Sequence, residues 1–404
     1  MNLRILVKLV AIALPLFACS NGNDDPDGLP SSSSGNPHEE PQDSSSSSDA
    51  SSSSSATNPS SGSNVSSSSS IADEPVVPSV SSGSLLINFT SDYRTGVLRW
   101  MKPNAISLDA GTIALPQDSK ISASTENIFV LSRLPGLLTC ISPETIGDAS
   151  TIKQRALAAS NPYDVAVIGS KGYIALFDVD YLQIFNTNTC EPGETINLPV
   201  SGANAASIKA SGDTLLVILQ RLESLDATKP GLLVRIKAST KTVIDTIQLK
   251  LYNPHSSVLS KGKLYVSAQP RYNKDYSYDY AKSGVEVVDL ATGTAEVLVT
   301  GANLGGGAYS VAIDEANQIL YVSVSASMGN QPVKSVDLSG GQVGAALPNI
   351  TDSSGDIVFD EEAKKLFVGD RSGLKVYNPA IKLTTTINQG GNALPPYSLA
   401  IARW

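Results

Sequence analysis

Histidine, tryptophan, methionine and cysteine are scarce in this chain of 404 residues, which has two, two, three and three of them respectively. Of the two histidines, His38 lies in a serine-rich segment, so only His255 belongs to a sequence able to fold. One such histidine excludes multi-histidine metal sites and most histidine-based catalysis. No nucleophile elbow, metal-ligand spacing or nucleotide-binding glycine motif stands out. We therefore predict no catalytic residue, no metal and no cofactor.

The chain also lacks an excess of basic charge. Its formal net charge is −9, but residues 84–404 hold 27 basic and 29 acidic side chains, so this part is nearly neutral. A nucleic-acid backbone is bound through a basic surface, so that class of partner is disfavoured.

The first residues carry a short apolar run, Leu9 to Phe17, preceded by Arg4 and Lys8. This run is shorter than the roughly 20 residues that span a bilayer and is typical of an export signal. The sequence Leu16-Phe17-Ala18-Cys19 resembles the bacterial lipoprotein box. The resemblance implies a signal peptide over residues 1–18 and a lipid on Cys19. Ordinary signal cleavage beside a chance cysteine is the alternative.

Residues 19–83 continue from this box into serine runs at 31–34, 44–48, 51–55 and 66–70. They have almost no apolar surface to offset the loss of chain entropy on folding. We expect a disordered linker that holds the rest of the chain away from a membrane, in the cell envelope, at the outer membrane or the cell surface.

From residue 84 onward, short β-rich runs are separated by Gly, Asn, Asp and Pro, which indicates an all-β fold. One unit recurs, and its second strand is seen in Leu264-Tyr265-Val266 and Leu320-Tyr321-Val322. The first strands of the units have anchor residues 42 to 54 positions apart: Ile121, Val165, Ile208, Ser257, Val311, Ile357 and Leu399. This period fits four-stranded propeller blades.

The two ends of residues 84–404 complement each other. Residues 396–401 form a first strand with nothing after it, whereas residues 84–115 supply later strands without a first. We therefore predict a seven-bladed β-propeller in which both termini close one blade. An open sandwich or two β-domains is the alternative.

The stretches Gly262–Val266, Gly284–Thr292 and Ile236–Leu249 resemble the YVTN-type seven-bladed propellers, relatives of the NHL and lactonase-like propellers. The resemblance covers nearly all of 85–404. It implies the architecture but not an activity, since propellers have many functions.

Three long loops are expected on one face of the propeller, at 220–231, 269–284 and 325–333. Loops of this length in a compact fold are commonly functional. The second is rich in tyrosine, which suits sugar rings and protein surfaces. Its predicted ligand contacts are Arg271, Tyr272, Tyr276, Tyr278 and Tyr280. The alternative is that these tyrosines only fix the loop to its blade.

The turns between blades place aromatic or polar residues at equivalent positions, and we predict Tyr163, His255, Tyr309 and Tyr397 at the mouth of the central channel. Recurrence in successive units favours a structural role, but a ligand-binding role is the second possibility. His255 differs from the tyrosines because an imidazole titrates near neutral pH.

Cys140 and Cys190 remain as a pair if Cys19 is lipidated. A disulfide is the expected state in an oxidising compartment. The alternative is a buried Cys140 and a free thiol at Cys190.

These features favour a membrane-tethered, non-enzymatic module that does not bind nucleic acid and whose monomeric propeller binds a glycan or protein through the long-loop face. A lactonase-like hydrolase acting at the channel mouth and an assembly subunit of an envelope complex are the alternatives. Enzymes of the lactonase-like kind gather acidic residues and a histidine at the channel, and the sequence shows no recognisable acidic cluster.

Overall fold

The computed structural model divides the chain into two units, Met1–Glu74 and Pro75–Trp404. The structure describes residues 79–80, 82–124, 126–224, 226–273, 277–327, 329–353, 355–389 and 394–403, all in the second unit. Cys19 and the serine-rich segment therefore lie outside the described residues. Within the described ranges, no helix combines the length and the apolar character that crossing a membrane requires.

The second unit is a seven-bladed β-propeller, in which each blade is a four-stranded antiparallel sheet. From inner to outer strand, blades one to seven are β30 (Pro396–Ala402), β1 (Ser84–Phe89), β2 (Gly96–Met101) and β3 (Ile113–Leu115); β4 (Ser119–Ala123), β5 (Ile128–Ser132), β6 (Leu137–Ile141) and β7 (Lys153–Ala156); β8 (Pro162–Ile168), β9 (Lys171–Leu176), β10 (Tyr181–Asn186) and β11 (Pro192–Asn197); β12 (Ala205–Ser211), β13 (Thr214–Leu219), β14 (Pro230–Lys237) and β15 (Thr242–Tyr252); β16 (Pro254–Ser260), β17 (Lys263–Ala268), β20 (Gly284–Asp289) and β21 (Thr294–Thr300); β22 (Gly307–Asp314), β23 (Ile319–Ser325), β24 (Val333–Asp337) and β25 (Val343–Ala346); and β26 (Ile357–Asp360), β27 (Lys365–Asp370), β28 (Gly373–Asn378) and β29 (Leu383–Thr386).

A few short elements lie between these strands. Two 3₁₀ turns, Pro143–Thr145 and Ala149–Thr151, connect β6 to β7, and the four-residue helix α1 (Gly301–Leu304) follows β21. The strands β18 (Arg271–Tyr272) and β19 (Tyr278–Asp279) pair in the connection between β17 and β20.

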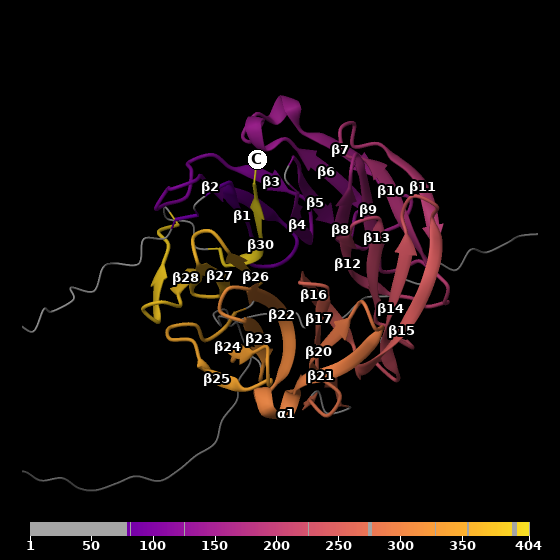
Figure 1. The fold of residues 1–404 in the computed structure, drawn as a ribbon. Coiled ribbons are helices and arrows are strands. Elements are labelled where there is room, and N and C mark those ends of the chain that lie inside the picture. The colour runs from indigo at the N-terminus through magenta and orange to yellow at the C-terminus, as the bar shows by residue number, and fades with distance from the viewer. Residues whose placement is uncertain are drawn as a thin grey trace, which may run out of the picture. The chain divides into compact units, whose positions relative to one another are not determined.

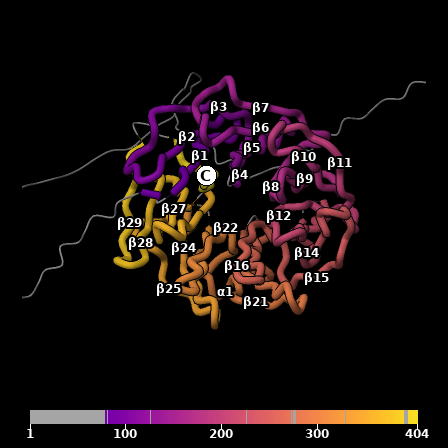
Figure 2. The backbone as a smooth tube through the Cα atoms, turned by 45° about the horizontal axis from the view of Figure 1, so that its top comes forward, coloured from indigo at the N-terminus to yellow at the C-terminus, as the bar shows by residue number. Residues whose placement is uncertain are grey.

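The blades stand around a central channel, with their first strands innermost and their fourth strands at the periphery (Figures 1 and 2). Each of the seven predicted anchors lies in an inner strand, which confirms the period deduced from the sequence. Because neighbouring strands alternate in direction, the start of each inner strand and the connection between second and third strands share one face. We call this the loop face, and the opposite one the turn face.

The termini close blade one, as the complementary ends of the sequence predict. β30 pairs with β1, and Leu399 lies opposite Ile87 in the register. In Figure 1 the yellow strand β30 lies beside the indigo strand β1. Packing begins before the predicted boundary at residue 84, because Val80 is buried in the core and its carbonyl accepts a hydrogen bond of 2.9 Å from the Asn104 N–H.

The hydrophobic core is divided among the joints between blades. Each of seven clusters of buried side chains, counted within the described part of the chain, combines residues from two adjacent blades. Phe367 and Val376 of blade seven pack with Leu85 and Ile87 of blade one at the closing joint. A blade alone would expose both faces, so the burial that stabilises it requires a complete ring.

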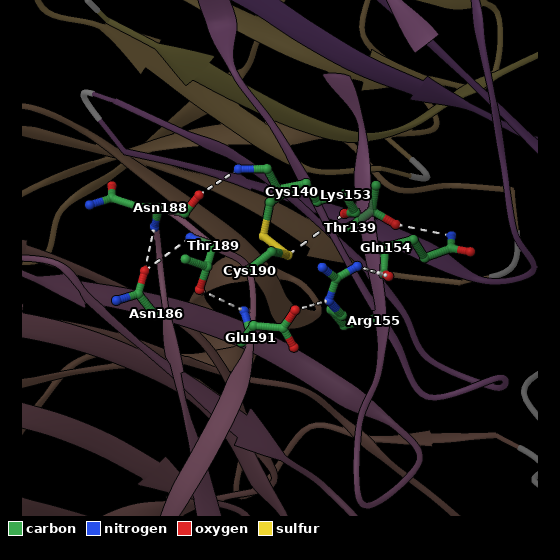
Figure 3. The surroundings of a disulfide bond; sticks show 10 residues. All are labelled: Thr139, Cys140, Lys153, Gln154, Arg155, Asn186, Asn188, Thr189, Cys190 and Glu191. Atoms are coloured by element: carbon green, nitrogen blue, oxygen red, sulfur yellow. Dashed lines mark hydrogen bonds and ion pairs between the residues drawn. A yellow bond between two sulfur atoms is a disulfide. The ribbon is translucent and has the colours of Figure 1, made fainter. Parts of the chain in front are cut away.

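Cys140 and Cys190 form a disulfide in the structure (Figure 3). Cys140 lies on β6 of blade two, and Cys190 in the turn after β10 of blade three, with both side chains in the core between these blades. Arg155 of β7 also pairs with Glu191 at 2.6 Å, and the Lys153 ammonium donates to the Asn188 carbonyl. The joint between blades two and three is therefore held covalently and by polar contacts at its rim.

Candidate functional site

Irregular pairing of the inner strands explains why aromatic side chains meet at the channel. Five inner strands have a register shift near their first residues, and each shift includes the residue two positions before the anchor. These residues are Tyr163, Ala206, His255, Tyr309 and Tyr397. A β-bulge turns its extra side chain away from regular alternation. The bulges thus explain why the aromatic side chains of this set, which are all but Ala206, converge at the channel.

The turns before these strands have a shared backbone structure. Asn161, Asn204 and Asn253 each adopt a positive φ, a conformation in which asparagine is enriched. The carbonyl of each accepts a hydrogen bond from a backbone N–H beyond the second strand of the blade, as in Phe177 to Asn161 at 3.0 Å. These hydrogen bonds hold each of the three turns against the end of the second strand of its own blade.

The side chains delivered by these bulges form an aromatic plug, consisting of Tyr163, His255, Tyr309 and Tyr397 together with Tyr93 and Arg133 from second-to-third-strand connections. His255 stacks on Tyr309 with ring centroids 4.6 Å apart, and its other neighbour, Tyr163, meets it edge-on at 6.4 Å. Tyr93 packs edge-to-face on Tyr397 at 4.9 Å. These contacts form two groups at the loop-face end of the channel, one of Tyr163, His255 and Tyr309 and the other of Tyr93 and Tyr397.

Arg133 joins the two sides of the plug. Its guanidinium donates a hydrogen bond of 2.9 Å to the Tyr397 hydroxyl and lies 5.0 Å from the ring centroid of Tyr163. The same group forms an ion pair with Asp118, and both side chains are about 5% exposed. A buried arginine requires such a counter-charge. The sequence prediction missed Arg133 and Asp118 because nothing in their local sequence indicates that they meet.

His255 is unsuited to proton transfer at neutral pH. Burial, with the positive charge of Lys120 nearby, lowers the pKa of His255 to about 3. The imidazole is therefore neutral. Its Nδ1 lies 3.2 Å from the Tyr309 carbonyl oxygen, and because a carbonyl can only accept, Nδ1 carries the hydrogen and donates it. A base with so low a pKa accepts protons weakly at neutral pH.

One residue further along the chain, each blade carries a polar side chain, and six of these seven side chains belong to residues that line the channel cavity. The neck ring, as we call this set, consists of the residues immediately before the seven anchors: Lys120, Asp164, Ser207, Ser256, Ser310, Asp356 and Ser398. Several connect one blade to the next. The Ser398 hydroxyl accepts from the Ile121 N–H at 3.0 Å, and the Asp164 carboxylate from the Ile208 N–H at 3.0 Å.

The neck ring also explains the exceptional anchor Ser257. Its hydroxyl lies 2.8 Å from that of Ser207 in the preceding blade. The anchor of this blade is polar because its side chain forms a hydrogen bond with the neighbouring blade, whereas the other anchors are aliphatic. Asp164 and Asp356 are the channel carboxylates that the sequence analysis did not recognise. Alignment of the seven units on their anchors is the signal that would have revealed them.

The predicted contacts of the 269–284 loop lie in a separate place, on a short hairpin. Arg271 on β18 pairs with Asp279 on β19 at 3.1 Å, and the two strands are in antiparallel register. Tyr278 and Tyr280 are half-buried, with ring centroids 6.1 Å apart. Tyr276 and the side chain of Tyr272 lie outside what the structure describes.

Tyr280 links this hairpin to the adjacent blade. Its hydroxyl donates to the Ala326 carbonyl, which lies in the connection between β23 and β24 of blade six. This contact fixes the hairpin to blade six. It also joins two of the three long loops into one surface.

Among the described residues, no three His, Cys, Asp or Glu side chains gather in a group that could hold a metal ion. The carboxylates of the neck ring are instead paired with lysines: Asp164 with Lys209 at 2.6 Å, and Asp356 more loosely with Lys120 at 3.8 Å. Although burial opposes the shift, the Lys209 ammonium lowers the pKa of Asp164 below its usual value. The channel therefore contains balanced charges.

Comparison with solved structures shows the propeller fold. Hydrazine synthase of Kuenenia stuttgartiensis aligns with a TM-score of 0.57 at 14% identity, covering 80% of this chain and 99% of that one. A functionally unknown protein of Desulfotomaculum acetoxidans aligns with a TM-score of 0.55 at 12% identity, covering 80% and 99%. Apo AztD of Citrobacter koseri has a TM-score of 0.50 at 14% identity and coverage of 79% and 98%.

These identities are so low that the similarity extends to the fold alone. No protein-family model matches the chain, and no curated protein matches it. The resemblance to the YVTN repeat thus remains a prediction. Since propellers with this architecture differ in function, the site must be interpreted from its own residues.

Proposed function

We propose that this protein is a non-catalytic binding module whose loop face recognises a glycan or a protein. The observation that carries the proposal is the β18–β19 hairpin, which is the only sheet outside the blades in the described part of the chain. The four-stranded blades close the ring without this hairpin, so we infer that the hairpin acts at the surface. Half-buried Tyr278 and the Arg271–Asp279 pair offer an aromatic face beside balanced charge.

The hairpin test separates ligand contact from packing. The variant Tyr272→Ser/Tyr276→Ser/Tyr278→Ser retains Tyr280 and its hydrogen bond to blade six. Binding of the full chain to an array of immobilised glycans, and to proteins extracted from the cell surface, is compared with that of Tyr181→Ser, a tyrosine variant in blade three. We expect the triple variant to lose binding with its melting temperature lowered by only a few degrees. Binding unchanged from wild type would contradict a hairpin site.

We also propose that Cys19 carries a lipid and that residues 19–83 tether the propeller to a membrane of the cell envelope. The proposal rests on the Leu16–Cys19 box and on the serine-rich composition that follows it. Changing Cys19 to alanine should move the protein from the membrane fraction to the soluble fraction. Retention in the membrane fraction with unchanged mass would contradict the anchor.

A hydrolase acting in the channel is the second candidate, because the structure brings Asp164, Asp356 and His255 around one cavity. The neutral, hydrogen-bonded His255 and the lysine partners of both carboxylates favour a binding role over this candidate. Hydrolysis of a panel of lactones and esters by the purified chain, with and without divalent metals, distinguishes the two. Turnover abolished by Asp164→Asn or Asp356→Asn would establish the hydrolase.

A further inference from the structure

A cavity of about 240 Å³ occupies the central channel beneath the aromatic plug. Tyr163 and His255 of the plug line it, whereas Arg133 and Tyr397 of the plug do not, so the cavity ends at the plug on the loop-face side. Its lining continues down the inner strands to residues that are partly exposed at their other ends, among them Ala123 and Ile401. This arrangement places the entrance on the turn face.

The two carboxylates at the neck of this cavity differ in how fully they are bonded. Asp164 accepts hydrogen bonds from Val165 N, Ser207 Oγ, Ile208 N and Lys209 Nζ at 2.6 to 3.0 Å. Such a carboxylate has little capacity left for a ligand. The Asp164–Lys209 pair therefore belongs to the joint between blades three and four.

Asp356 and Lys120 form the other pair, and it is open. The shortest distance between the ammonium and the carboxylate is 3.8 Å, beyond hydrogen-bond length, and the side chains keep 22% and 19% of their surface accessible. Ser398 donates to Asp356 Oδ2 at 2.8 Å, which leaves Oδ1 facing Lys120. Within the described residues the Lys120 ammonium donates no hydrogen bond. One cation and one anion thus present unused bonding capacity to the cavity.

The part of the cavity away from the plug has a mixed lining, in which apolar side chains stand beside Ser122 and Lys209. Ala123, Val358, Ala400 and Ile401 line it on the side away from the plug. A molecule oriented by the Lys120–Asp356 pair would place any tail against these side chains. At about 30 Å³ for each water molecule, the space corresponds to roughly eight waters, which is the size of a small metabolite.

We propose that this channel cavity binds a small zwitterion, an α-amino acid with an apolar side chain. Its carboxylate would accept hydrogen bonds from Lys120, its ammonium would donate to Asp356, and its side chain would contact Val358 and Ala400. The neck ring and the adjacent Lys209 together hold two lysines and two aspartates, so a ligand without net charge leaves these partly buried charges balanced. A ligand with a single charge would leave one uncompensated. The site is distinct from the hairpin and does not depend on the proposed function.

The test is calorimetric titration of the full chain in detergent micelles with three probes of similar shape. Leucine has both charges, 4-methylpentanoate only the carboxylate, and 3-methylbutylamine only the ammonium. We expect leucine to bind with a dissociation constant of about 1 mM or tighter, and each single-charge probe at least about tenfold more weakly. No leucine binding at about 10 mM, or equal binding of either single-charge probe, would overturn the proposal.

Variants then locate the binding. Lys120→Met and Asp356→Asn should each weaken leucine binding at least about tenfold, whereas Lys382→Met, at an exposed lysine, should leave it unchanged. Val358→Trp fills the apolar end without changing a charge, so it tests the site even if a neck variant fails to fold. Leucine binding preserved in a folded Val358→Trp variant would place the ligand elsewhere. The hairpin triple variant should bind leucine as wild type does, which separates failure of this inference from failure of the proposed function.

Discussion

Leu85 pairs with Ile401 across the closure of blade one, although 315 residues lie between them in the chain. The strand that carries Ile401 is the innermost of its sheet, and Leu399 within it is buried in the core shared by blades seven and one. The last strand therefore contributes both to its sheet and to the joint between the first and last blades. Ring closure is a contact of very long sequence separation.

Loss of this strand should destabilise the whole propeller. Deleting residues 396–404 removes the inner strand of blade one and exposes an unpaired edge, so the variant should aggregate or unfold at a much lower temperature. The milder Leu399→Ala substitution should reduce the free energy of unfolding by about 2–5 kcal/mol. Urea unfolding measured by circular dichroism gives both values. An undiminished, cooperative transition in the deletion variant would show that the ends do not hold the ring.

The predictability of closure has a physical reason. Every blade needs the same alternation of apolar strands and turns to bury its faces, so the repeat is visible in the sequence even when blades share little identity. Residues 396–401 and 84–115 each lack the strands that the other supplies, and this complementarity predicts the seven-bladed ring. Spacing alone places Ser257 in an inner strand, since its polar side chain gives no sign of a core position.

The site was less predictable, because it depends on contacts between blades. The tyrosines at the channel could be located from the recurring turns, but the bulges that bring them together depend on the pairing of each strand. Arg133 and Asp118 come from different strand connections, and no local pattern relates them. Asp164 and Asp356 are ordinary turn residues in the sequence, and only their equivalent place around the ring makes them neighbours of one cavity.

Breaking the buried ion pair of the plug should be costly. Arg133→Met leaves the Asp118 carboxylate buried without its partner, and we expect the free energy of unfolding to fall by about 3–5 kcal/mol. Tyr397→Phe removes only the hydrogen bond to Arg133 and should cost about 1.5–3 kcal/mol. Arg94→Met, at an exposed arginine, serves as the matched control, with an effect within about 0.5 kcal/mol. A change below about 1 kcal/mol for Arg133→Met would argue against the plug as a stabilising cluster.

The disulfide should stabilise the joint between blades two and three. It closes a loop with a sequence separation of 50, for which the chain-entropy estimate is about 4 kcal/mol, and measured values are commonly about 2–4 kcal/mol. Reductant should therefore lower the melting temperature of the wild type. The Cys140→Ala/Cys190→Ala variant is the control, because its melting temperature should already be low and should not respond to reductant. An equal response of both proteins would assign the effect to something other than this bond.

Glu286 gives the propeller a pH dependence that can be separated from that of His255. Its carboxyl group on β20 is fully buried and accepts hydrogen bonds from the Lys250 and Leu251 N–H groups of β15, at 2.8 and 3.4 Å. Burial nevertheless raises its pKa from 4.5 to about 7. The folded state then retains a proton that the unfolded state releases, so this group's contribution to stability is full below pH 4.5 and is lost as the pH rises to about 7. At 1.36 kcal/mol for each pH unit, the loss is at most about 3 kcal/mol.

His255 acts in the opposite direction over part of the same range. Its pKa falls from 6.5 to about 3 on folding, so the unfolded state takes up a proton first and stability decreases as the pH falls below 6.5. Between pH 4.5 and 6.5 the two slopes therefore oppose each other in the wild type. Glutamine cannot ionise, so in Glu286→Gln only the pH dependence due to His255 should remain. The free energy of unfolding should then rise up to about pH 6.5 and level off above it. Urea unfolding at several pH values tests this, with Glu126→Gln, at an exposed glutamate, as the control. If Glu286→Gln and wild type show the same pH profile, Glu286 does not titrate between the folded and unfolded states as its burial indicates.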